Sequence, residues 1–100
     1  MKGEEFKQKM LKLKEQFEDI LYKIEDWDAY IYQQKFAEQL HWQVKKHILE
    51  LKYYLEQYEL GNTTESYHDK LYGDFCRFLQ FDKNGLSRFQ KEADLFIAPR

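Results

Sequence analysis

The sequence is poor in the residues that most often interrupt or cross-link a chain, with one Pro, four Gly and one Cys in 100 residues. The single Cys76 excludes an internal disulfide. Its largely apolar and aromatic neighbours in GDFCRFLQF predict a buried, unreactive thiol. Apolar runs are only a few residues long, and MKGEEFKQKM lacks the apolar centre of a secretion signal. We therefore expect a cytoplasmic protein with no membrane-spanning helix.

A strong net charge is also missing. Charged residues make up 34% of the chain, yet the formal charge is only -2. The chain as a whole is therefore not attracted to nucleic acid or to an anionic membrane, and any electrostatic role must come from local segregation of charge. A length of 100 residues suits one hydrophobic core, so residues 1–100 are expected to form a single helical domain.

Two apolar stripes with helical spacing are present. The first consists of Phe6, Met10, Leu13, Phe17, Ile20, Ile24 and Trp27, and the second of Ala37, Leu40, Val44, Ile48, Leu51, Leu55 and Tyr58. They predict one amphipathic helix over about residues 4–26 and a second that ends near 60, at Gly61. A tight turn is expected near 26–29. The alternative is one helix of over fifty residues, which would need a partner chain to cover its stripe.

The C-terminal part is expected to hold two shorter helices. NTTES offers several N-caps, with Asn62 and Glu65 at capping-box spacing, and predicts the start of a third helix. FDKNGLS is typical of a turn, after which Ser87 could cap a fourth helix. A β-hairpin around Asn84 and Gly85 is the alternative for this segment. The predicted fold is an all-α small helical bundle of two long antiparallel helices plus two short C-terminal helices.

Two Glu-x-x-His pairs, Glu38 with His41 and Glu65 with His68, match the spacing that di-iron carboxylate bundles use. Lysines flank the first pair, whereas His68 lies on the apolar stripe of its helix, so the pairs face different surroundings. We therefore expect no metal and no cofactor. No Ser or Cys has a recognisable catalytic partner, and we expect a protein that is not an enzyme.

The second predicted helix carries another apolar band opposite its core stripe. Trp42, Leu49 and Tyr53 align along the helix, with Lys46 beside them. Either the C-terminal helices cover this band, or it is exposed and binds a partner, since large aromatic side chains are favoured in protein interfaces. We take these four residues as the candidate partner-binding site.

Charge is segregated along the chain. Residues 1–14 hold five Lys and two Glu, a balance of +3, while residues 15–28 hold six acids and one Lys, a balance of -5. Antiparallel packing would gather lysines of both long helices at one pole as a candidate anion-binding site. This set is Lys7, Lys9, Lys12, Lys14, Lys45 and Lys52. Lysines without arginine suggest contact with phosphates rather than base readout.

The sequence thus favours a small non-enzymatic protein-binding module, an adaptor or inhibitor of the kind that phages and mobile elements encode. The alternative is a nucleic-acid-binding accessory protein that uses the lysine-rich pole, and a metal-binding bundle comes third. The heptad spacing of the first helix and the 18% aromatic content also predict a homodimer.

Overall fold

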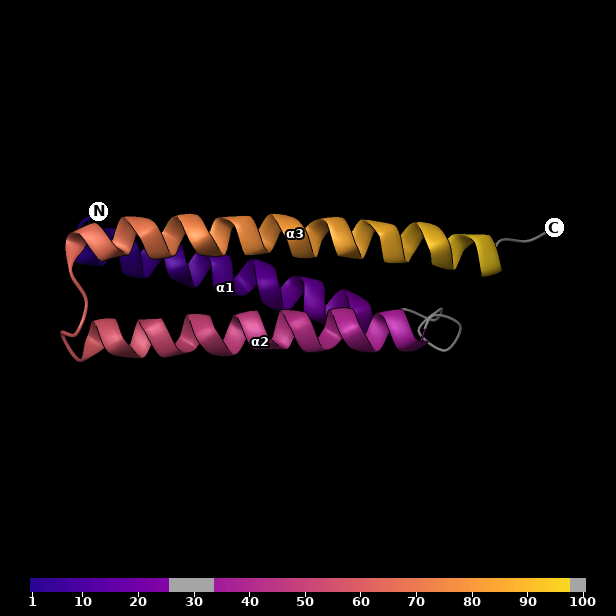
Figure 1. Ribbon diagram of the computed structural model, residues 1–100, viewed down its shortest axis with the longest axis horizontal. Coiled ribbons are helices and arrows are strands. Elements are labelled where there is room, and N and C mark those ends of the chain that lie inside the picture. Colours follow the sequence, from indigo (N-terminus) through magenta and orange to yellow (C-terminus); the bar gives the residue numbers. More distant parts are fainter. Residues whose placement is uncertain (26–33, 98–100) are drawn as a thin grey trace.

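Three helices make up the structure, a computed structural model that describes residues 1–25 and 34–97, with side chains described for 1–25 and 36–91. They are α1 (Gly3–Glu25), α2 (Gln34–Glu59) and α3 (Glu65–Ile97). They form an elongated bundle of 56 × 17 × 16 Å, in which α2 and α3 follow the long axis and α1 runs obliquely against them (Figure 1). The all-α prediction is confirmed: no strand occurs in the described ranges.

Helices α1 and α2 are antiparallel. Lys7 Nζ lies 2.7 Å from Glu59 Oε1, and His41 Nε2 lies 2.7 Å from Glu25 Oε1, so the start of one helix meets the end of the other. This packing rules out the single helix of over fifty residues. The predicted turn near 26–29 lies outside the described residues.

Gly61 ends α2, as predicted. Its φ of 75° is the left-handed conformation that glycine adopts without steric cost. The Gly61 amide donates to the Tyr58 carbonyl and the Asn62 amide to the Gln57 carbonyl, both at 2.9 Å. These two bonds form a Schellman motif, which satisfies carbonyls that the end of the helix would otherwise leave unpaired.

Among the N-caps that NTTES offers, α3 uses Thr64 rather than Asn62. Thr64 precedes α3, and its Oγ1 accepts a hydrogen bond from the Tyr67 amide at 3.4 Å. Asn62 instead donates its side-chain amide to Gln57 Oε1 at 3.0 Å, at the end of α2. Thr64 is therefore the N-cap, a position that favours a short hydroxyl side chain.

The two short C-terminal helices and the hairpin alternative were both wrong, because α3 continues through FDKNGLS to Ile97. Packing against α2 explains the difference. Gly85 faces Leu40, and a Cβ at Gly85 would lie 2.8 Å from Leu40 Cδ1. Asp82 is fully buried and accepts hydrogen bonds from Gln43 and His47. Residues that favour a turn locally are here the residues that let α3 approach α2, and tertiary packing overrides their weak helix propensity.

The core is built around α1, which packs against both other helices. Its buried residues are Phe6, Met10, Leu13, Phe17, Ile20 and Ile24. The first predicted stripe is thus confirmed over its described part, and α2 and α3 of the same chain cover it. The stripe therefore does not need a second copy of the protein to cover it. The homodimer stays a prediction, and of the two observations behind it only the aromatic content remains.

No helix in the described part of the chain has an apolar stretch long enough to cross a bilayer.

Candidate functional site

The two Glu-x-x-His pairs lie at opposite ends of the bundle. His41 is bonded to Glu25 at the C-terminal end of α1, whereas His68 is buried beside the N-terminus. Nothing in the described ranges brings three or more His, Cys, Asp or Glu side chains together in a way that could hold a metal ion. The geometry therefore gives neither pair the additional ligands that a di-metal centre needs.

His68 has a structural role. Its Nδ1 donates to the Met1 carbonyl at 3.3 Å, which leaves Nε2 to accept from the Thr63 hydroxyl at 2.6 Å. The imidazole stacks on the Phe6 ring with centroids 4.1 Å apart. The N-terminal ammonium also pairs with Asp69 at 3.0 Å. These contacts attach the start of α1 to the first turn of α3.

Several members of the lysine set are paired with nearby carboxylates. Lys7 pairs with Glu59, Lys9 with Glu5 at 3.0 Å, and Lys14 with Glu18 at 3.3 Å. The hydrogen bonds to Glu59 and Glu5 raise the pKa of Lys7 and Lys9 above the usual lysine value. Each of these lysines thus has a carboxylate beside it, which weakens its attraction for a phosphate.

The other three lysines, Lys12, Lys45 and Lys52, are exposed, and Lys45 lies apart from the rest of the set along the bundle. The register set by the Lys7–Glu59 and Glu25–His41 pairs places Lys52 at the level of Lys14. Lys45 lies about two turns further along, beside the acidic half of α1.

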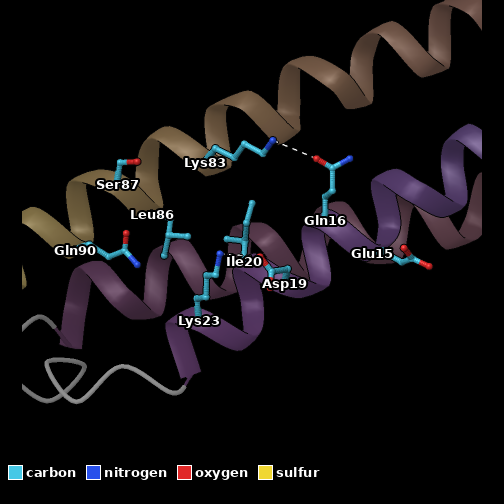
Figure 2. Close-up of a pocket in the computed structure, with 9 residues that line it drawn as sticks. All are labelled: Glu15, Gln16, Asp19, Ile20, Lys23, Lys83, Leu86, Ser87 and Gln90. Atoms are coloured by element: carbon cyan, nitrogen blue, oxygen red, sulfur yellow. Dashed lines mark hydrogen bonds and ion pairs between the residues drawn. The ribbon is translucent and has the colours of Figure 1, made fainter.

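The hollow between α1 and α3 is polar and internally paired (Figure 2). Lys83 reaches across it and donates to Gln16 Oε1 at 3.2 Å, while Lys23 pairs with Asp19 at 2.9 Å. Its apolar contribution is limited to Ile20 and Leu86, both of which belong to the core. With Lys83 bonded to Gln16 and Lys23 paired with Asp19, this hollow offers little to a ligand.

The apolar band predicted on α2 is exposed. Trp42 is 66% exposed, Leu49 64% and Tyr53 55%, so α3 does not cover them. Lys46 is also exposed, and its Nζ lies 5.7 Å from the centroid of the Trp42 ring, which is within the range of a cation–π contact. The structure thus presents all four predicted residues on one accessible face of the bundle.

An aromatic cluster extends this face towards the start of α3. The Tyr53 ring contacts Tyr54 edge-on at 5.2 Å, and Tyr54 contacts Tyr67 in the same way at 6.3 Å. A hydrogen bond with Tyr67 raises the pKa of Tyr54 above the usual tyrosine value, so the Tyr54 phenol stays neutral at physiological pH. The band is therefore continuous with an aromatic surface that spans α2 and α3.

Phe81 on α3 belongs to the same face and was missed from the sequence. It is 64% exposed and lines, with Trp42 of α2, a hollow of about 420 Å³. The other lining residues are Gln43, Lys46, His47, Arg77 and Phe78. A signal was present, since Phe81 lies off the apolar stripe of its helix, four residues after Arg77. Because a turn was predicted for this segment, Phe81 was not assigned to a helix face.

A second hollow, of about 300 Å³, adjoins the first at Phe81 and Gln43. Gly85 and Leu40 lie in close contact at its base, and Phe36 and Phe81 flank it. Gln39, Asn84 and Arg88 complete it. We refer to the two hollows together as the α2–α3 groove.

A buried polar network lies at the base of the groove. Asp82 accepts from Gln43 Nε2 and from His47 Nδ1, both at 2.6 Å. The His47 imidazole stacks on the Phe78 ring with centroids 4.7 Å apart and planes within 2°. A buried carboxylate is tolerated when it is hydrogen-bonded in this way, and the bonds hold α2 and α3 in register.

An Asp–His pair beside a hollow also occurs in hydrolytic triads, where it activates a hydroxyl or thiol nucleophile. The hollow that His47 lines contains no Ser, Thr or Cys in the described part of the chain. Cys76, which is half-buried, is bonded instead to Tyr72, whose pKa this bond raises. The pair therefore serves to fix the two helices.

No family model matches this chain, and no curated protein or solved structure resembles it at a significant level. The geometry of the α2–α3 groove is thus the basis for a functional assignment.

Proposed function

We propose that this protein is a non-enzymatic protein-binding module whose α2–α3 groove and adjoining band on α2 contact another protein. The observation that carries the proposal is the exposure of Trp42 and Phe81 on either side of one hollow. Exposing two large aromatic side chains beside each other is unfavourable in water, and contiguous patches of this kind mark interaction sites. Trp and Tyr are also over-represented among the residues that dominate binding energy.

The supporting residues are rigid. Phe81 and Trp42 each project from a helix, and the Asp82 network links those helices beneath them. A rigid surface loses little conformational entropy when it binds. We infer an adaptor or inhibitor that acts by occupying a surface of a larger protein, the class that phages and mobile elements often encode.

Photo-crosslinking tests this proposal. A benzophenone amino acid replaces Phe81 or Trp42 in the full chain, and the matched control carries it at Tyr22, which is 64% exposed on α1. We expect a discrete crosslinked protein from the two groove positions and none from the control. Equal crosslinking at all three positions, or none at Phe81 and Trp42, would contradict the proposal.

The nucleic-acid alternative has less support. Lys7, Lys9 and Lys14 have carboxylates beside them, and Lys45 lies away from the rest of the set. The number of released counterions sets the salt dependence of nucleic-acid binding, so a steep loss of DNA affinity with salt would favour the alternative.

A further inference from the structure

We propose that α3 contains a hinge at residues 82–87, about which its C-terminal part opens away from α1 and α2 while its N-terminal part stays packed. The inference goes beyond the proposed function, because it concerns the protein without a partner. Three features support it: the composition of the hinge, the contacts that fix its N-terminal side, and the weaker packing on its C-terminal side.

The hinge is the segment of α3 with the most residues that disfavour a helix. Its sequence is DKNGLS, and four of these six residues are Asp, Asn, Gly or Ser. No other six consecutive residues of α3 include as many of these types. Asp, Asn and Ser side chains bond to the backbone in non-helical conformations, and Gly loses more entropy in a helix than any other residue. A break in α3 is therefore least unfavourable here.

The N-terminal side of the hinge is fixed to α2. Asp82 is fully buried and accepts hydrogen bonds from Gln43 and His47, both at 2.6 Å. One turn earlier, the Phe78 ring stacks on the His47 imidazole. Separating these groups would leave a buried carboxylate without donors, which is strongly unfavourable. The part of α3 up to Asp82 therefore stays on α2 when the rest opens.

Packing is weaker on the C-terminal side of the hinge. Three of the twelve residues 71–82 are exposed, against five of the nine residues 83–91. Hollows also flank this side, the α1–α3 hollow of about 540 Å³ and the hollow of about 300 Å³ in the α2–α3 groove (Figure 2). Segments with fewer buried side chains open at a lower free energy than the core of a protein.

Contacts that hold the C-terminal side lie at a helix end or in solvent. The Phe89 ring stacks on Phe36 with centroids 6.3 Å apart, and the Arg88 guanidinium lies 5.2 Å from the centroid of the same Phe36 ring. Phe36 belongs to the first turn of α2, where helices fray. The hydrogen bond from Lys83 to Gln16 is exposed. Water can replace such contacts more easily than the buried bonds of Asp82.

Opening would change one half of the α2–α3 groove. Apart from Phe81, the α3 residues of the 300 Å³ hollow lie in or after the hinge, so this hollow exists only in the closed state. The hollow between Trp42 and Phe81 is lined from α3 by residues before the hinge, and it persists. The open state exposes the buried side chains of Leu86 and Phe89, which makes it the minor state.

Native-state hydrogen exchange tests the hinge in the full chain. Amide protection is measured by NMR over residues 71–80 and 86–91 at several low urea concentrations. We expect residues 86–91 to share one urea dependence and one protection factor, about a hundredfold below that of residues 71–80. Fraying from the C-terminus would instead make protection fall gradually from residue 80 to residue 91.

Two variants separate a local opening from global unfolding. Gly73→Ala stabilises the part of α3 that is packed in both states. We therefore expect the protection of residues 71–80 to rise about threefold and that of residues 86–91 not to change. Asn84→Ala/Ser87→Ala raises the helix propensity of the hinge at two exposed positions, and we expect it to raise the protection of residues 86–91 about fivefold.

Four outcomes would overturn the inference: equal protection on the two sides of the hinge, a gradual fall along α3, the same increase at residues 71–80 and 86–91 in Gly73→Ala, or no response of residues 86–91 to Asn84→Ala/Ser87→Ala. None of these measurements involves a partner. The proposed function is tested separately, by crosslinking from Phe81 and Trp42, so either proposal can fail while the other stands.

Discussion

Asp82 illustrates how one side chain can serve both the fold and the surface. It is fully buried, yet both of its carboxylate oxygens accept hydrogen bonds from α2. Its partners Gln43 and His47 line the groove, so the network that joins the helices also positions the surface proposed to bind. At the scale of single residues, we therefore expect substitutions in the buried polar network to change stability and substitutions of the exposed aromatic side chains to change binding.

Replacing Asp82 with Ala should cost about 3–5 kcal/mol in the free energy of unfolding, because Gln43 and His47 lose their buried acceptor. The control is Asp74→Ala, which removes a partner of the exposed Arg77 and should cost at most about 1 kcal/mol. Urea denaturation followed by circular dichroism measures both. Equal losses would show that the buried network contributes no more than a surface pair.

Trp42 and Leu51 should respond differently to truncation, although both are apolar and lie on α2. Leu51→Ala empties a fully buried position and should cost about 2–5 kcal/mol of stability. Trp42→Ala and Tyr53→Ala should change stability by roughly 0.5 kcal/mol or less, because these side chains are largely exposed, while a bound partner is lost. Thermal melts beside the crosslinking assay separate the two effects. A loss of stability in Trp42→Ala comparable to that of Leu51→Ala would move the interface elsewhere.

At the scale of the helices, the two glycines of α3 differ in how closely other side chains approach them. Gly73 and Gly85 lie in the same helix, but their surroundings differ. A Cβ at Gly73 would meet only the Arg77 guanidinium at 3.9 Å, whereas one at Gly85 would press on the buried Leu40. The first glycine is thus dispensable to the packing of α3, and the second sets how closely α3 approaches α2.

Gly73→Ala should therefore stabilise the protein by about 0.5–1 kcal/mol, since alanine loses less entropy than glycine in a helix. Gly85→Ala has the same gain in propensity but must displace Leu40, so we expect no net stabilisation and a shifted α2–α3 contact. Denaturation curves compare the two substitutions. The packing argument would be wrong if both gave the same increase.

For the whole molecule, the packing of α1 against both other helices determines whether the stability of the bundle depends on protein concentration. Its apolar stripe is covered within the chain, so stability conferred by that stripe is intramolecular. A heptad-driven dimer would behave differently, because its melting temperature rises with concentration.

Phe17→Ala tests whether the apolar stripe of α1 is covered within one chain. Phe17 is fully buried and contacts the His47 ring of α2 at 5.7 Å between centroids. The substitution should cost about 3–5 kcal/mol, and the loss should be the same at two protein concentrations a hundredfold apart. Calorimetry at both concentrations, with light scattering for the mass, provides the measurement. A loss that shrinks at high concentration would show that a second chain covers the stripe.

Local patterns were enough to predict much of this protein. The stripes of α1 and α2 follow from helical periodicity, and Gly61 ends α2 because only glycine adopts a positive φ without strain. Half of the candidate surface, from Trp42 to Tyr53, could be placed on one face of α2 for the same reason.

Tertiary structure decided the rest. Residues 81–87 have the composition of a turn, and their helical conformation depends on Leu40, Gln43 and His47, more than thirty residues away in the chain. Only the packing of α3 on α2 brings Phe81, Arg77 and Arg88 beside the predicted band. The physical reason is that turn propensity is worth about 1 kcal/mol per residue, whereas burial and hydrogen bonding between distant residues are worth several times more.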